Sequence, residues 1–124
     1  MPDNEIRPFI RVQTRKKRLH INLAAHDMLG KPPYLEFFWN DENKMLVIVP
    51  VADPHIHCFI VPERNLRSRK FEIILHGMSF VSALMSRMDW RGDMIYKIYG
   101  EHLPDYNMIG FPMSEAIITE EAAV

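Results

Sequence analysis

Two short stretches of alternating apolar and polar residues, joined by a run of four cations, constrain the fold of this chain most. The stretches are residues 9–14 and 19–23, and the run Arg15-Lys16-Lys17-Arg18 separates them. A period of two is typical of a strand with one buried face. Adjacent cations repel one another and are costly to bury, so they belong in a solvated turn. The sequence therefore predicts an antiparallel hairpin with a basic turn.

Turn-forming residues divide the rest of the chain into similarly short elements. Asn22 is suited to accept a backbone N–H at the start of a short helix over 23–29. Gly30 is suited to end that helix in a left-handed conformation, and Pro32-Pro33 prevents its continuation. Further along, the pattern predicts strands at 34–39, 44–51, 55–61, 70–75, 94–99 and 108–113, a helix at 77–88, a basic connection at 62–69, a turn at 100–107 and a short acidic tail at 115–124.

The order of these elements repeats. Strand, basic connection, strand, helix, strand, turn and strand occur once over about 6–51 and again over about 55–114, without sequence identity between the halves. A chain of 124 residues can bury one core and is short for two domains. We therefore expect a single domain over 1–124 of the β-rich α+β class, in which two β-β-α-β-β half-units form a small pseudo-symmetric barrel-like domain.

Composition indicates the compartment in which the protein is expected. Hydrophobic residues make up 48% of the chain and charged residues 25%, which is typical of globular proteins. Cys58 is the only cysteine, so an intrachain disulfide is excluded. The sequence shows no apolar run of membrane-spanning length and no signal-peptide pattern at its start. These features predict a cytoplasmic protein without a membrane partner.

The basic residues gather in two stretches, although the net charge is only −1. Such local clusters can contact phosphates even when the total charge is neutral. Recurrence of a basic connection at matching places in the two halves favours a nucleic-acid interface. The predicted interface residues are Arg11, Arg15, Lys16, Lys17 and Arg18 in the first half and Arg64, Arg67, Arg69 and Lys70 in the second.

The order of strand, polar turn, strand, short helix, strand, turn and strand resembles the AbrB/MazE/MraZ class of swapped-hairpin transcription factors. The resemblance covers 9–51 and, more loosely, 55–113. It implies a barrel of two interleaved units, here within one chain, and DNA contact through basic residues on the first hairpin, as in bacterial or phage regulators. The segments 18–22 and 70–74 lack the glycine and proline that the family commonly shows there.

The sequence gives less support to a metal site or a catalytic site than to a nucleic-acid interface. His55 and His57 lie two residues apart and would share one face of a strand, as zinc ligands can, but Cys58 would face the opposite side. The chain has no glycine-rich phosphate loop and no nucleophile elbow. We therefore expect no catalytic residue, no metal and no cofactor.

Two functions remain. The first is a small DNA-binding regulator that contacts duplex DNA through two basic hairpins. The alternative is a protein-interaction factor, such as a phage or mobile-element accessory protein, an inhibitor or an antitoxin-like partner, which would use its aromatic and methionine side chains. The sequence is compatible with a monomer and with a homodimer.

Overall fold

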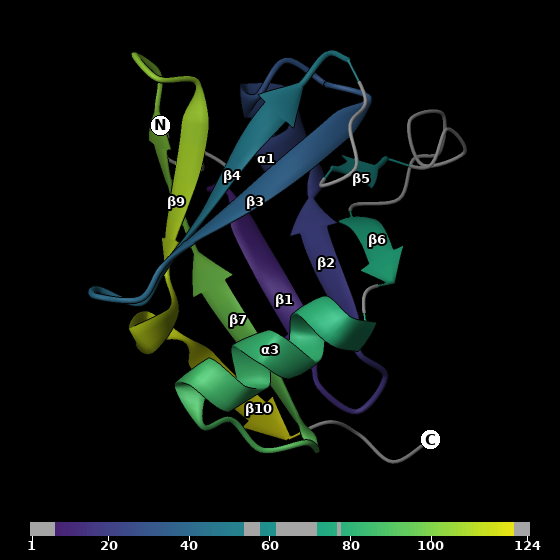
Figure 1. The fold of residues 1–124 in the computed structure, drawn as a ribbon, viewed down its shortest axis with the longest axis vertical. Helices are drawn as coiled ribbons and strands as arrows, with labels where there is room; N and C mark the ends of the chain where they lie inside the picture. Colours follow the sequence, from purple (N-terminus) through teal and green to yellow (C-terminus); the bar gives the residue numbers. More distant parts are fainter. Residues whose placement is uncertain (1–6, 54–57, 62–71, 77, 121–124) are drawn as a thin grey trace.

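The computed structural model describes residues 7–53, 58–61, 72–76 and 78–120. Two five-stranded antiparallel sheets carry most of the described chain, and we name them sheet A and sheet B (Figure 1). Sheet A has the order β10 (Ile117–Glu120), β7 (Met94–Tyr99), β1 (Phe9–Gln13), β2 (Arg18–Asn22) and β6 (Glu72–His76). Sheet B has the order β5 (Phe59–Ile60), β3 (Tyr34–Asn40), β4 (Met45–Val51), β9 (Met108–Pro112) and β8 (Glu101–Leu103).

The chain passes between the sheets at two corners. At the first, Gly100 separates β7 in sheet A from β8 in sheet B. A Cβ atom at Gly100 would lie 2.5 Å from the Phe111 ring and 2.8 Å from Ile109, so only glycine lets the backbone turn this close to β9. At the second corner, the 3-10 helix η1 (Met113–Glu115) leads from β9 back to β10. Corners of this kind let two sheets enclose one core.

One hydrophobic core lies between the inner faces of the two sheets. In sheet A, alternate residues such as Ile10, Val12 and Ile98 are fully buried, and in sheet B Leu46 and Phe111 are buried in the same way. The alternation along β1, in which Ile10 and Val12 are buried between half-buried neighbours, is the pattern that the sequence predicts for a strand with one covered face.

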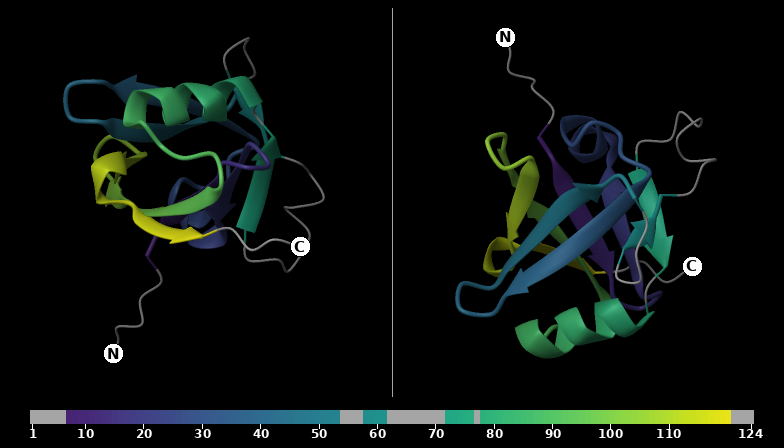
Figure 2. Two further views of the ribbon diagram at one scale, coloured as in Figure 1. Left: turned by 90° about the horizontal axis from the view of Figure 1, so that it is seen from below. Right: turned by 45° about the horizontal axis from the view of Figure 1, so that its top comes forward.

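Two helices cover the ends of this core. α1 (Leu23–Met28) begins at Asn22, whose Oδ1 accepts a hydrogen bond from Ala25 N, and is followed by Gly30 at φ 88°. Both capping predictions are thereby confirmed. α3 (Met78–Met88) crosses the opposite end of the molecule (Figure 2) and packs Phe80 against both Phe37 of β3 and Phe59 of β5, with ring centroids 5.0 and 5.6 Å away.

The structure confirms the β-rich α+β class and the first hairpin. β1 and β2 pair in the register Val12↔Leu19 and Gln13↔Arg18 around a turn over residues 14–17. Arg18, expected in the turn, instead begins β2.

The second half pairs differently from the hairpin predicted between 55–61 and 70–75. β5 joins β3 in sheet B, whereas β6 joins β2 in sheet A. Likewise β3 pairs with β4, but β7 and β9 lie in different sheets. Element order alone does not specify the pairing partner, because each strand must cover whichever inner face and edge the rest of the fold leaves open.

Two segments predicted as irregular are strands. The turn predicted at 100–107 contains β8, which pairs with β9, and the acidic tail predicted at 115–124 contains β10, which pairs with β7. In the tail, the β-branched residues Ile117, Ile118 and Thr119 outweigh the acidic residues around them. No helix in the described ranges has the length and hydrophobicity needed to cross a membrane.

Candidate nucleic-acid interface

The β1–β2 turn presents cations at one end of sheet A. Arg15 and Lys16 are exposed, while Lys17 takes a left-handed conformation with φ 54°. The Lys17 ammonium reaches α3, where its Nζ lies 3.4 Å from Met85 Sδ. At the base of the turn, the buried Thr14 hydroxyl donates to Met94 O over 2.8 Å and accepts from Met94 N over 3.0 Å. The turn is therefore held against β7 while two of its cations face solvent.

A row of basic side chains crosses the outer face of sheet A. The strand register places Lys97 of β7 opposite Arg11 of β1, and Arg11 opposite His20 of β2. Their inward-facing neighbours, such as Val12 and Ile98, are buried, so these three side chains point outward. Neighbouring strands lie about 4.8 Å apart, so the row spans about 10 Å.

Two aromatic rings lie beside this row. Phe9 of β1 pairs with Tyr99 of β7, and the rings meet edge to face with centroids 5.9 Å apart. Lys97 Nζ lies 4.3 Å from the Phe9 centroid and 4.9 Å from the Tyr99 centroid. The Arg7 guanidinium lies 4.4 Å from the Tyr99 centroid, and that of Arg11 lies 5.7 Å from the Phe9 centroid. Cation–π attraction thus holds several charges over the rings.

Asn22 fixes the start of β1, which carries part of this cluster. Its side-chain Oδ1 accepts from Phe9 N over 3.0 Å, and its Nδ2 donates to Arg7 O over 2.8 Å. On the other side, Gly100 N donates to Pro8 O over 2.8 Å. The backbone bearing Arg7 and Phe9 is therefore clamped between the helix cap and the β7–β8 corner.

The charged residues within β7, β1 and β2 are all basic. No carboxylate side chain lies on the outer faces of β7, β1 and β2, all of whose residues the structure describes. The Gln13 side-chain Oε1 lies 2.8 Å from His20 Nε2. We name this surface the cationic face and define it by the side chains Arg7, Phe9, Arg11, Arg18, His20, Lys97 and Tyr99.

The structure describes five of the predicted interface residues. Arg11 and Arg18 lie on the cationic face, and Arg15, Lys16 and Lys17 lie in the adjoining turn. The predicted residues Arg64, Arg67, Arg69 and Lys70 fall outside the described residues.

The sequence prediction did not include Arg7, Phe9, His20, Lys97 or Tyr99 among the interface residues. The period of two contained a usable signal, because it places Phe9 on the same side of β1 as Arg11. It gave no indication that β7 would lie next to β1, which is a long-range pairing.

The outer face of sheet B has a different character. Phe38 of β3 is 51% exposed and lies opposite Val47 of β4. A shallow groove of about 550 Å³ here is lined by Phe38, Trp39, Asn40, Asp41, Val47, Val49 and Met108. The exposed acids Asp41, Glu42 and Glu101 lie on or beside this sheet. We name this surface the apolar face and define it by Phe38, Val47, Val49, Leu103 and Met108.

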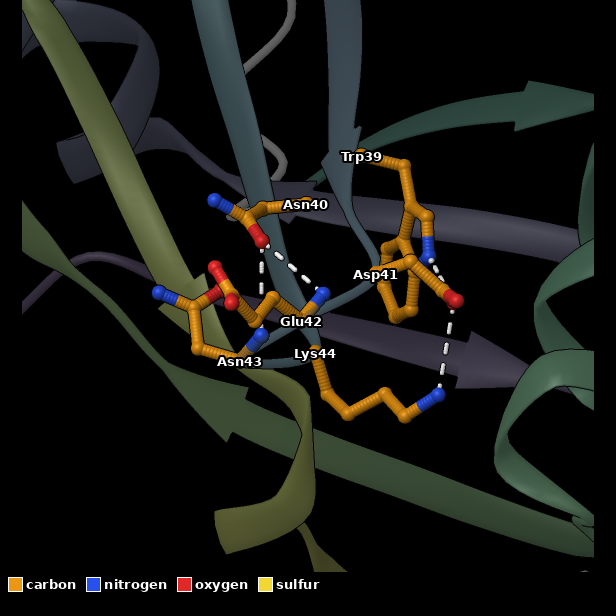
Figure 3. Close-up of polar contacts among 6 residues, drawn as sticks. All are labelled: Trp39, Asn40, Asp41, Glu42, Asn43 and Lys44. Atoms are coloured by element: carbon orange, nitrogen blue, oxygen red, sulfur yellow. Dashed lines mark hydrogen bonds and ion pairs between the residues drawn. The ribbon is translucent and has the colours of Figure 1, made fainter.

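A compact turn borders the apolar face (Figure 3). Asn40 Oδ1 accepts from Glu42 N and Asn43 N over 3.0 and 3.3 Å. Asp41 Oδ1 accepts from Trp39 Nε1 over 3.0 Å and from Lys44 Nζ over 3.3 Å. These hydrogen bonds, together with the Lys44 charge, hold the pKa of Asp41 below its ordinary value because they favour the ionised carboxylate.

Metal chemistry finds no support in the described part of the chain. It contains no group of three or more histidine, cysteine, aspartate or glutamate side chains placed to hold a metal. His55 and His57, the candidate pair, lie outside the described residues. His26 is buried, with Nε2 2.8 Å from the Pro32 carbonyl oxygen, as expected for a structural histidine. Cys58 is half-buried.

Comparison of the chain with protein-family models, with curated proteins and with solved structures finds no match. The resemblance to the AbrB/MazE/MraZ class therefore stays a prediction from the order of elements.

Proposed function

We propose that this protein binds nucleic acid through the cationic face and the adjoining β1–β2 turn. The observation that carries the proposal is the row Lys97, Arg11 and His20 across three paired strands, with Arg7 beside it and no carboxylate on those outer faces. Phosphate groups of a polynucleotide are the repeated anions that such a row accommodates.

The aromatic rings favour nucleic acid over other polyanions. An acidic peptide would pair with the cations alone, whereas a polynucleotide offers both phosphates and flat rings. Phe9 and Tyr99 lie within 5 Å of the Lys97 ammonium, measured to each ring centroid. Alternating charge and aromatic surface is typical of proteins that contact sugar–phosphate backbones and bases together.

Duplex DNA is the ligand predicted from the sequence, and a non-catalytic regulatory role in the cytoplasm goes with it. The first basic hairpin supports contact with the phosphates of a duplex or of a single strand, because Arg15 and Lys16 are exposed at its tip. A protein that contacts DNA in this way associates through phosphate contacts first and specifies sequence through further contacts to base edges.

The proposal is tested by fluorescence anisotropy with labelled duplex and single-stranded oligonucleotides at low salt. We expect binding that weakens at least about tenfold between about 50 and 200 mM salt, because phosphate contacts release counterions. Lys97→Ala should weaken binding severalfold. Lys31→Ala is the matched control, because Lys31 has a side chain 72% exposed at the end of α1. Absence of binding to every oligonucleotide at low salt would contradict the proposal.

The apolar face supports a second candidate function, binding of a protein partner. Phe38 and Leu103 are 51% and 39% exposed there, and their neighbours Val47 and Val49 line the groove. Apolar surface surrounded by polar side chains is typical of interaction sites. The exposed acids beside it favour a partner with a basic rim.

This second candidate is tested by sedimentation and by capture of a partner after nuclease treatment. Phe38→Asp should abolish association, whether with a second copy or with another protein. Tyr106→Asp is the control, because Tyr106 is 73% exposed in the turn between β8 and β9. If Phe38→Asp binds the partner as well as Tyr106→Asp does, the apolar face has no role in the association.

A further inference from the structure

The two rings of the cationic face are placed to meet flat ligands. Phe9 and Tyr99 are half-buried on the outer face of two central strands, and their planes are inclined by 71°. Their close surroundings are cations, with Lys97 between them and Arg7 over Tyr99 at 4.4 Å. A cross-strand aromatic pair stabilises a sheet, and here the pair also places two rings among cations on the solvent side of the strands.

We propose that Phe9 and Tyr99 stack on unpaired bases, so that the ligand of the cationic face is single-stranded nucleic acid. This inference rests on the proposed nucleic-acid binding function and names the substrate class of the same surface. Each base takes the place of the cation over a ring, Lys97 over Phe9 or Arg7 over Tyr99, and the displaced cations contact the phosphates that flank the stacked base.

Duplex DNA does not offer Phe9 and Tyr99 an open base face on which to stack. In a duplex, the flat faces of the bases are covered by neighbouring base pairs, and only base edges are exposed in the grooves. A ring on a sheet surface can reach a base face only where the base is unstacked. Sheet surfaces that combine aromatic rings with cations bind single strands without strict sequence preference, because every base offers a π face.

The surface next to Tyr99 has room for a nucleotide. A groove of about 850 Å³ begins at Arg7 and Tyr99 and continues past Gly100 to Glu101 and Glu115. This volume lies in the range of sites that hold small molecules. A base stacked on Tyr99 can extend into this groove while its phosphate stays near Arg7.

A purely structural role for the rings makes a different prediction. If the rings only hold Lys97 and Arg7 in place, the ligand's bases are irrelevant and its phosphates alone determine affinity. An oligonucleotide whose sites are abasic keeps the phosphates and removes the stacking partners. Comparison of a mixed-sequence strand, the same strand made abasic and the matching duplex therefore separates the two roles.

We expect the intact strand to bind at least about tenfold more tightly than the abasic strand or the duplex. Phe9→Ala and Tyr99→Ala should each weaken binding of the intact strand by about 5- to 150-fold, the range for loss of one base–aromatic stack. The same variants should leave binding of the abasic strand nearly unchanged. Tyr99→Phe keeps the ring and should retain affinity, and Tyr106→Ala, an exposed tyrosine away from sheet A, is the matched control.

A measurement on the unmodified chain covers the case in which a variant fails to fold. Irradiation with a 5-iodouracil-substituted strand should cross-link peptides that contain Phe9 or Tyr99. Equal affinity for intact strand, abasic strand and duplex, or cross-links confined to other peptides, would overturn the stacking inference while leaving nucleic-acid binding intact. Absence of binding to all three ligands at low salt would instead overturn the proposed function itself.

Discussion

The outer faces of the two sheets differ although both cover the same core. On sheet A, every charged side chain of the three central strands is basic, and the half-buried rings of Phe9 and Tyr99 lie beside cations. On sheet B, Phe38 faces outward beside Val47 and Val49, and the nearby exposed charges at Asp41, Glu42 and Glu101 are acidic.

The comparison indicates that the buried inner faces of the two sheets determine the fold, whereas the residues of the outer faces are free to vary. Both inner faces are filled by aliphatic and aromatic residues that burial fixes, such as Ile10 in sheet A and Ile48 in sheet B. The outward positions of an antiparallel sheet carry no such constraint. The two outer faces can therefore differ in charge and polarity although they cover one core.

Exchanging charge on the two faces should give the largest effect. Arg11→Glu combined with Lys97→Glu should weaken nucleic-acid binding at least about 100-fold, because two charged contacts are lost and repulsion is added. Glu42→Lys combined with Asp105→Lys, an exposed residue of the β8–β9 turn, changes the charge beside sheet B by the same amount in the other direction and should alter affinity by only a few fold. Anisotropy titrations measure both, and thermal melts followed by circular dichroism verify folding. A similar loss for both pairs would erase the distinction between the faces.

Removal of the Asn22 clamp should have the next largest effect. Asn22→Ala removes the cap of α1 and leaves Phe9 N and Arg7 O without their side-chain partners. We expect a loss of about 2–4 kcal/mol in the free energy of unfolding, measured by urea denaturation. Asn22→Asp keeps the acceptor and should lose less. An unchanged unfolding free energy would show that the start of β1 is held by other contacts.

Substitution at Gly100, in the corner between β7 and β8, should destabilise the protein less than loss of the Asn22 side chain. Gly100→Ala forces a Cβ atom to within 2.5 Å of the Phe111 ring, and we expect a loss of about 1–3 kcal/mol. Gly92→Ala is the matched control, because its added Cβ would lie 3.6 Å from Met85 Cε in ordinary contact. Denaturation curves of the two variants measure the difference. Equal free energies of unfolding for Gly100→Ala and Gly92→Ala would mean that the corner accommodates the added Cβ atom without cost.

The smallest effect concerns the acidic rim of the apolar face. The pKa of Asp41 is lowered by hydrogen bonds from Trp39 and Lys44, so its contribution to stability is present above the ordinary aspartate pKa and is lost as the pH falls through the lowered value. A carboxyl-detected NMR titration should give a pKa below 3.8. Lys44→Ala should raise this pKa, whereas Lys31→Ala, in the segment after α1, should not. An unchanged value in Lys44→Ala would contradict the contact drawn in Figure 3.

The sequence predicted local features well. The hairpin of β1 and β2, the capping role of Asn22 and the helix end at Gly30 are confirmed, because each depends on residues within a few positions along the chain. The prediction was wrong for β8 and β10. Their short length and polar neighbours hide the strand pattern, and pairing with β9 and β7 supplies the stability that local propensity lacks.

The sequence by itself determined that Arg11 would lie on the solvent side of a basic hairpin, since a period of two assigns each residue of a strand to a face. Only the tertiary structure decided that β7 pairs with β1 and brings Lys97 and Tyr99 beside Phe9, a contact across about 90 residues of chain. Local alternation is encoded by neighbouring residues. The choice of a strand partner depends on which edges and faces the whole chain must cover, and that information is distributed over the core.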